Sequence, residues 1–296
     1  MTTTTQNHLT SIPDDIDPAV LAVLLKSLAK GWWWDKTHNP FRGCRKTSPG
    51  CVNCWALIDI IRRLQHRTGG VYDGLTGPTF YPDELAAYAR DLQPKRYFTP
   101  SMSDPFLDDF SDEQIFAFFE AIAAAPWHYY FTLTKRSERL AQLGPYLPWG
   151  EHVIAVVSVE DEKRMRRIAD LQQCGAARKG VSFEPVVGRV PLRDNRDLVR
   201  GLDYAIVGGE TADRDKVRPM KIEHAREIVE VCLEENVPVM FKQIGDVDFE
   251  GNYVGRKKAG RQLDSRTYDA LPLGCADHLN RGVTLAEIER MRRRSR

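Results

Sequence analysis

The sequence predicts an α/β fold, a full or partial (β/α) barrel built on parallel strands. From residue 95 onward, short β-branched or aromatic runs alternate with segments of helical periodicity, and this alternation implies right-handed crossovers between parallel strands. The strand runs are continuously apolar, which is typical of strands buried on both faces. A length of 296 residues suits one barrel of about 250 residues with extensions. A doubly wound open sheet is the alternative.

The N-terminal segment is predicted to be a tail followed by a helix. Residues 1–17 are expected to be flexible, and Pro18 is well suited to the first position of a helix over 19–30. Gly31 ends this helix, because glycine is common just after a helix C-terminus. The aromatic run 32–34 then leads into a cysteine-rich loop.

The barrel elements follow this loop. A first strand is expected near the cysteines, a helix from Cys54 onward and a loop over 69–82. Six further strands are predicted at 96–100, 129–133, 153–159, 180–183, 204–207 and 237–241. The helices between them are predicted at 112–124, 137–143, 162–173, 195–200 and 223–235. The chain is thus divided into a tail and helix (1–30), the barrel (31–275), and a C-terminal helix, at 285–291, with an Arg-rich tail (276–296).

Composition excludes several classes of protein. The formal net charge is +1, from 42 basic and 41 acidic residues, so any nucleic-acid surface has to be local. Candidates are the basic stretch 256–261, the arginines of the last seven residues, and the tryptophans at 32–34 for base stacking. No apolar run approaches the ~20 residues of a membrane span, and no signal-peptide pattern is present. We therefore expect a cytoplasmic protein with no membrane partner.

Three of the six cysteines lie in one short loop, with the spacing C-x6-C-x2-C. Cys44, Cys51 and Cys54 are therefore candidate metal ligands, and the last of them is expected at the positive N-terminus of a helix. Nearby cations are expected to lower the pKa of these thiols. The cations are Arg42, Arg45 and Lys46. The scattered cysteines are expected to be buried and inert, and they are Cys174, Cys232 and Cys275.

Three thiolates with no obvious fourth ligand favour an iron–sulfur cluster. A structural zinc site normally has four protein ligands. A [4Fe–4S] cluster held by three cysteines instead leaves one iron open to chelate a small molecule. Zinc with His38 as the fourth ligand, and structural thiols without any metal, remain alternatives.

Polar residues and glycines follow nearly every predicted strand, at the sheet edge where ligands bind in α/β folds. They are Ser101, Ser103, Asp104, Thr134, Lys135, Ser158, Glu160, Glu184, Gly208, Gly209, Glu210 and Lys242. Helix capping explains any one of them, but not six successive strand ends. A lysine on a buried strand needs a partner, so Lys242 is expected to pair with Glu184 or Glu210. We assign catalytic roles to Lys242 and Glu184.

Short motifs that follow one another along the chain give a further indication of its family. They are Asn39-Pro40, Gly43-Cys44, Ser48-Pro49-Gly50-Cys51, Ser101-Met102-Ser103-Asp104, Leu133-Thr134-Lys135-Arg136, Ser182-Phe183-Glu184-Pro185, Val207-Gly208-Gly209-Glu210, Arg218-Pro219-Met220, Phe241-Lys242-Gln243, Ala259-Gly260-Arg261 and Leu263-Asp264. With the cysteine loop, they resemble the radical SAM superfamily, and within it the phage and bacterial three-Cys-motif family, long described as a domain of unknown function. Compared with the superfamily motif, the first gap is longer, and Asn53 stands where an aromatic residue is usual.

The resemblance implies a barrel of radical SAM type with two cofactors. A [4Fe–4S] cluster would be held by the three cysteines, and S-adenosyl-L-methionine would bind its open iron. An electron donor such as flavodoxin or ferredoxin would supply the electron that yields a 5′-deoxyadenosyl radical. The substrate implied by phage relatives is a modified base in DNA, rearranged by an isomerase during thymine hypermodification in a bacterial host cell. Alternatives are a nucleic-acid repair lyase, a tRNA modification enzyme and a non-catalytic zinc-binding interaction module.

The cofactor also implies roles for the strand-end residues. The methionine ammonium is expected to bind Asp104 or Glu210, and the methionine carboxylate Lys135 or Arg136. The ribose hydroxyls are expected to bind one of three strand-end residues, which are Ser158, Glu160 and Glu184. Gly208-Gly209 would permit a close approach of the backbone to the ligand.

Overall fold

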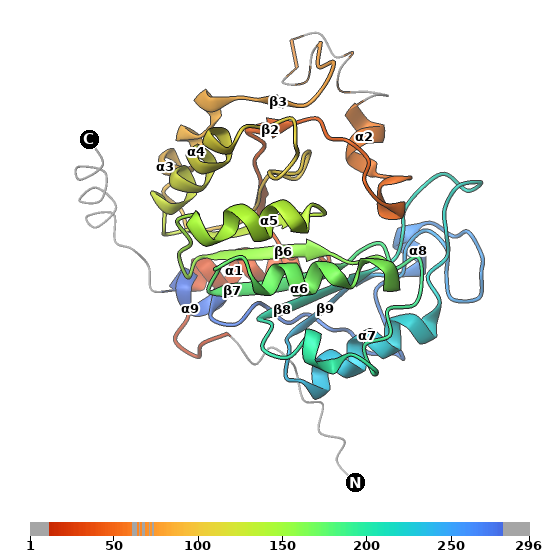
Figure 1. Cartoon of the computed structure of the whole chain (residues 1–296). Coiled ribbons are helices and arrows are strands. Elements are labelled where there is room, and N and C mark those ends of the chain that lie inside the picture. The colour runs from red at the N-terminus through yellow and green to blue at the C-terminus, as the bar shows by residue number, and fades with distance from the viewer. Residues whose placement is uncertain are drawn as a thin grey trace.

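The computed structural model describes residues 12–60, 64, 66, 69–70, 72 and 74–280. Over this range, seven parallel strands form one sheet that curls into a half-barrel (Figure 1). The strands are β1 (Lys36–Thr37), β4 (Arg96–Phe98), β5 (Tyr129–Thr134), β6 (Val153–Ser158), β7 (Arg178–Phe183), β8 (Tyr204–Gly208) and β9 (Val239–Gln243). They follow one another across the sheet in chain order, without a reversal. Because a doubly wound sheet reverses its order at a switch point, that alternative is excluded and the partial barrel is confirmed.

Helices connect these strands and cover the sheet (Figure 1). They are α1 (Pro18–Leu28), α2 (Trp55–Asp59), α3 (Ala86–Arg90), α4 (Asp112–Ala123), α5 (Ser137–Leu143), α6 (Arg166–Gln172), α7 (Ile222–Glu234), α8 (Arg256–Ala259) and α9 (Cys275–Asn280). A small antiparallel pair lies apart from the main sheet, between β2 (Phe41–Arg42) and β3 (Thr79–Phe80).

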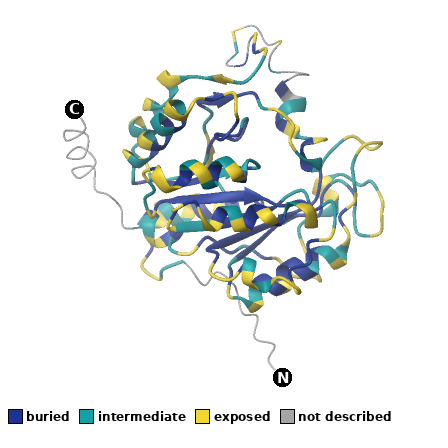
Figure 2. Ribbon diagram, viewed as in Figure 1, coloured by how far each residue is buried: buried dark blue, intermediate teal, exposed yellow. Residues whose placement is uncertain are grey.

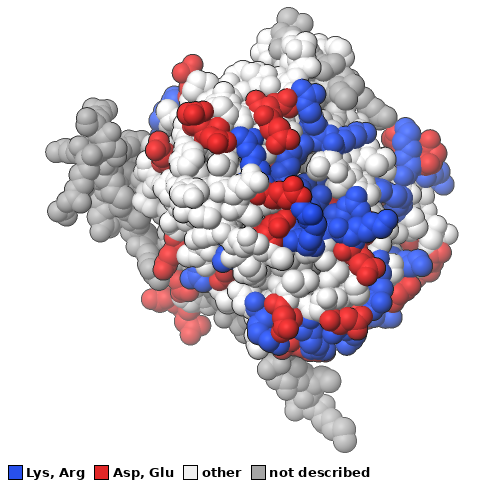
Figure 3. Space-filling model, in the orientation of Figure 1, with Lys and Arg blue, Asp and Glu red and all other residues white. Residues whose placement is uncertain are grey.

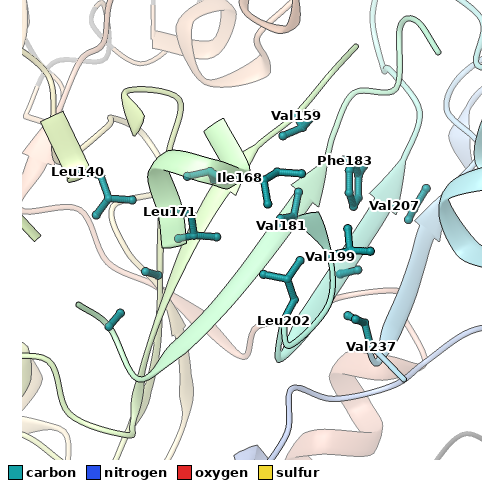
Figure 4. Packing of buried hydrophobic residues seen from close by; sticks show 14 of the residues in the cluster. Leu140, Val159, Ile168, Leu171, Val181, Phe183, Val199, Leu202, Val207 and Val237 are labelled. Atoms are coloured by element: carbon teal, nitrogen blue, oxygen red, sulfur yellow. The ribbon is translucent and has the colours of Figure 1, made fainter. Parts of the chain in front are cut away.

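Both faces of the main sheet are buried, as the continuously apolar strands predict (Figure 2). On one face, strand residues such as Val181 and Phe183 pack against the helices that follow the strands, including α5 and α6 (Figure 4). On the other face, Phe131 and Ile206 pack with Leu24 of α1 and with α9. The N-terminal helix is therefore part of the core of the half-barrel.

Several predicted elements differ from the structure. The helix expected at 195–200 is only a 3₁₀ turn, Arg196–Leu198. The loop expected over 69–82 contains strand β3, which pairs with a strand far away in the sequence and carries too few residues to show a pattern. The helix expected at 285–291 and the Arg-rich tail lie outside the described residues. None of the helices that the structure describes combines the length and apolar character needed to cross a membrane.

Candidate active site

The carboxyl ends of the strands border a cavity of about 960 Å³. It is lined by most of the predicted site residues, namely Cys44, Cys51, Cys54, Ser101, Ser103, Asp104, Lys135, Ser158, Glu184, Gly209, Glu210 and Lys242. Thr134, Glu160 and Gly208 do not line it. The strand ends therefore gather most of the predicted residues, from distant parts of the chain, around one space.

The cysteines reach this cavity on a single loop, residues 43–54, which we call the cysteine loop. At Gly43 the backbone has a φ of 81°, and a Cβ atom there would lie 2.8 Å from the carbonyl oxygen of Gly77, so the turn requires glycine. Cys51 ends a 3₁₀ turn and Cys54 precedes α2. Among the described residues, no three Cys, His, Asp or Glu side chains are already gathered as a metal site. All three cysteines line the same cavity.

The predicted lowering of the thiol pKa is wrong for Cys44. Burial raises the pKa of this thiol to about 12, and the charge of Asp104 adds to the rise, although Arg136 opposes it. The cations expected to lower it have other partners: Arg42 pairs with Glu84, Arg45 with Asp109, and Lys46 donates to the carbonyl of Val52. Cys44 is therefore a neutral thiol near pH 7, and a metal ion would have to displace its proton.

Glu160 anchors the cysteine loop to the end of β6. Its fully buried carboxylate accepts a hydrogen bond from Ser48 Oγ at 2.6 Å and pairs with Lys135 Nζ at 3.0 Å and Arg167 Nη1 at 2.9 Å. A Cβ atom at Gly50 would lie only 2.5 Å from Glu160 Oε1. Burial raises the pKa of Glu160, but the two cations and the serine outweigh burial and keep it below its usual value. The expected ribose contact is thus corrected, because this carboxylate faces the loop.

Glu210, after β8, anchors the same loop at a second point. Its Oε2 accepts hydrogen bonds from Asn53 Nδ2 at 2.9 Å and from the backbone N–H of Arg218 at 3.0 Å, and the Arg218 guanidinium pairs with both oxygens. Arg218 Nη2 also donates to the carbonyl of Pro49 at 2.9 Å. Burial raises the pKa of Glu210, but Arg218 and Asn53 hold it below its usual value. These partners occupy the carboxylate that was expected to bind the methionine ammonium.

Asp104 is a third anchor, beyond β4. Its carboxylate accepts from Thr134 Oγ1 at 2.7 Å and from Arg136 Nη1 at 2.9 Å. Arg136 Nη2 in turn donates to the carbonyl of Arg45, in the cysteine loop, at 2.8 Å. In this structure Asp104 and Arg136 thus anchor the cysteine loop, while both also line the cavity where a role in ligand binding was predicted.

The two predicted serines after β4 also contact their own chain. Ser103 Oγ donates to the carbonyl of Gly43 in the cysteine loop at 2.5 Å. Ser101 donates to Asn39 Oδ1 from its backbone at 2.7 Å and from its hydroxyl at 3.1 Å. Four strand-end residues, Ser103, Asp104, Glu160 and Glu210, thus fasten the loop that carries the thiols.

Gly208 and Gly209, at the end of β8, lie against other residues of the chain and not against open space. A Cβ atom at Gly209 would overlap the carbonyl oxygen of Ile244, and one at Gly208 would lie 2.6 Å from Glu184 Oε1. The close approach predicted for these glycines is therefore made to neighbouring strands and side chains.

Lys242 and Glu184 form a pair on the cavity wall, as the sequence predicts. Lys242 Nζ lies 2.8 Å from Glu184 Oε1, and the ammonium also lies 5.8 Å from the centre of the Trp34 ring. Ser182 Oγ donates to the other carboxylate oxygen of Glu184 at 3.2 Å. Both charged side chains keep partial exposure, 23% and 15%, so they can contact a ligand in the cavity.

The tryptophan run divides between core and cavity. Trp33 is buried and packs on Phe98 and Phe131, as a core residue does. Trp32 is 40% exposed and lies parallel to Trp34, with ring centres 6.0 Å apart, and all three tryptophans line the cavity. The Lys30 ammonium lies over the Trp32 ring, 4.6 Å from its centre, so a planar ligand that stacks on this indole would displace it.

His38 does not accompany the cysteines. It does not line the cavity, and its Nε2 lies 2.8 Å from the carbonyl oxygen of Glu84 while its ring packs on Tyr88. The structure therefore speaks against the alternative of a zinc site with His38 as the fourth ligand.

Three residues contribute to the site although the sequence alone assigns them no role. They are Asn53, Ser182 and Arg218. Ser182 lies on β7, two residues before Glu184, which follows the strand, and an extended chain places residues two apart on the same side. Arg218 lies in one of the short motifs, and Asn53 lies between two cysteines. Only the Ser182 position could have been derived from the sequence, because the other two depend on how the loops meet.

Comparison with known proteins gives one family. The model of the family DUF5131, described as a protein of unknown function, matches residues 29–272, which include the cysteine loop and every strand of the sheet. No curated protein and no solved structure matches the chain. The chain belongs to the DUF5131 family.

Proposed function

We propose that this protein is a radical S-adenosyl-L-methionine enzyme that acts on a modified base of DNA. The observation that carries the proposal is the placement of three cysteines, on one anchored loop, beside a large cavity at the carboxyl ends of parallel strands. In α/β folds this edge of the sheet is where substrates and cofactors bind.

The donor set suits an iron–sulfur cluster with one open iron. Cys44, Cys51 and Cys54 would hold a [4Fe–4S] cluster, and among the residues that the structure describes no histidine lines the cavity with them. Cys44 must lose its proton for such binding. With one electron from a donor such as flavodoxin or ferredoxin, the bound cluster and S-adenosyl-L-methionine would supply a 5′-deoxyadenosyl radical and release methionine.

The chain itself positions these partners. Glu160, Glu210 and Asp104 hold the cysteine loop against three strand ends. Lys242 and Glu184 stand at 2.8 Å from one another on the cavity wall, where the pair can orient a substrate and hold a proton at Lys242 Nζ.

The substrate class follows from the aromatic and basic lining. Trp32 and the half-exposed Trp55 offer ring faces at the cavity, and Arg256 and Lys257 line it as cations. A purine or pyrimidine stacks on such faces, and its phosphates favour cations nearby. We propose a rearrangement of the base substituent, an isomerase reaction, as the outcome.

The test is formation of 5′-deoxyadenosine by the anaerobically reconstituted protein with reductant, S-adenosyl-L-methionine and DNA that carries an amino-acid-modified thymine. We expect product from the wild type and from Cys232→Ala, which removes a buried thiol inside α7. Cys54→Ala should form none. Equal traces of 5′-deoxyadenosine in all three proteins would overturn the proposal.

A further inference from the structure

A second groove of about 820 Å³ opens beside the cysteine cavity. It lies between the cysteine loop, the segment that follows β4, the start of α5 and the residues around the start of α6. Nine of its sixteen lining residues are Lys or Arg, and three are Asp or Glu. The whole chain, in contrast, has 42 basic and 41 acidic residues, so this groove concentrates positive charge. Figure 3 shows Lys and Arg side chains gathered on this face, beside α5 and α6 and toward α2.

Seven of the nine cations of the groove form two groups, and the other two, Arg139 and Arg164, pair with Asp112 and Asp161. Lys135, Arg136 and Arg167 are largely buried and neutralise the loop anchors Glu160 and Asp104. The outer group is exposed and consists of Arg45, Lys46, Lys163 and Arg166. In the described part of the chain Lys163 has no ion-pair partner. Arg45 pairs with Asp109, and Arg166 pairs with Glu138 and, at 4.0 Å, with Asp170. Surface pairs of this kind exchange readily for another anion.

The groove adjoins the cysteine cavity. Arg45, Lys135 and Arg136 line both. A chain of phosphates along the groove would therefore end beside the cavity, which Trp32 and the Lys242–Glu184 pair line. This is the arrangement of a site that holds a strand by its backbone and takes one base for chemistry.

We propose that this groove binds the phosphodiester backbone of a DNA strand whose target base enters the cysteine cavity. The inference rests on the proposed function for the identity of the strand, but the binding itself requires neither cluster nor cofactor. The exposed cations Lys163 and Arg166 are assigned to phosphates rather than to the reacting base.

The test is the salt dependence of binding between the metal-free protein and a fluorescent single-stranded DNA of about a dozen nucleotides, which covers one typical binding site. Each phosphate contact on a single strand contributes about −0.7 to the slope of log K against log salt. The double variant Lys163→Gln/Arg166→Gln should therefore lose about 1.4 from the magnitude of this slope. The matched control is Arg193→Gln/Arg200→Gln, which removes the same charge from exposed side chains that do not line the groove.

Two results would overturn the inference: an equal loss of affinity in both double variants, or competition by inorganic phosphate as effective as competition by unlabelled strand. Its failure is distinguishable from failure of the proposed function. If the protein forms 5′-deoxyadenosine but binds no DNA strand, only the inference about the groove is refuted. Groove-dependent binding by a protein that never takes up iron refutes only the radical chemistry.

Discussion

Replacing Glu160 by glutamine should weaken the fold and loosen the cysteine loop. The native carboxylate is fully buried and compensates two cations, Lys135 and Arg167, whose side chains are only 17% and 9% exposed. Removing one partner of a buried pair costs ~3–5 kcal/mol. Because Lys135 retains some contact with water and glutamine can still accept from Ser48, we expect the lower end, about 3 kcal/mol.

This loss is measurable by urea denaturation and by the melting temperature of the metal-free protein. At ~2–4 °C per kcal/mol for a chain of this size class, the melting temperature should fall by roughly 6–12 °C. The matched control is Glu162→Gln, which removes an exposed carboxylate two residues away and should change stability by less than ~0.5 kcal/mol. The same change in both variants would refute the anchoring role.

The pH dependence supplies a second readout for the same residue. Since the pKa of Glu160 is lowered in the folded protein, its contribution is present above the unfolded value and is lost as the pH falls through the folded one. The difference between wild type and Glu160→Gln should therefore persist at pH 7 and narrow only below about pH 4. A difference that narrows already between pH 7 and 5 would contradict the assignment.

Three further results are expected. Gly209→Ala should lose more than about 3 kcal/mol of stability, because its Cβ atom would overlap a backbone carbonyl oxygen. The control Gly77→Ala has open space around the new Cβ atom and should change stability by less than ~0.5 kcal/mol. Similar denaturation midpoints for the two variants would contradict this prediction. Lys242→Met should keep the iron content and lower turnover by about 100-fold, and unchanged turnover would remove its catalytic role. Burial lowers the pKa of His128 and of His152 to about 4. As the pH falls from 6.5 to 4, each histidine should therefore lower the free energy of unfolding by up to ~1.4 kcal/mol per pH unit. Urea midpoints that stay constant over this pH range would refute the prediction.

The sequence predicts the sheet well because strand burial is a local pattern. A continuous apolar run such as β6 (Val153–Ser158) predicts a strand that is buried on both faces. In the half-barrel, helices do cover both faces of the sheet. The pairing of β2 with β3 could not be predicted, because strands of two residues show no pattern and form only through a partner far away in the chain. Here Phe41 lies opposite Phe80. The placement of the strand-end residues follows from the same regularity, since parallel strands end at one edge of the sheet.

The roles of those residues could not be derived in the same way. Asp104, Glu160 and Glu210 are acidic residues at strand ends, which suits either a ligand or a structural partner. The decision depends on the path of the cysteine loop, which brings Ser48 and Asn53 within hydrogen-bond reach of two of them. The pKa of Cys44 is misjudged for a related reason, because burial outweighs the neighbouring cations.

The cysteines themselves give the most direct test of the account. After anaerobic purification and reconstitution, iron, sulfide and zinc should be counted in the wild type, in Cys51→Ala and in Cys232→Ala, the last of which alters only a buried thiol of α7. We expect roughly four irons per chain in the wild type and in Cys232→Ala, and a loss of iron in Cys51→Ala. Zinc without iron, or the same iron content in all three proteins, would contradict the assignment of a cluster to Cys44, Cys51 and Cys54.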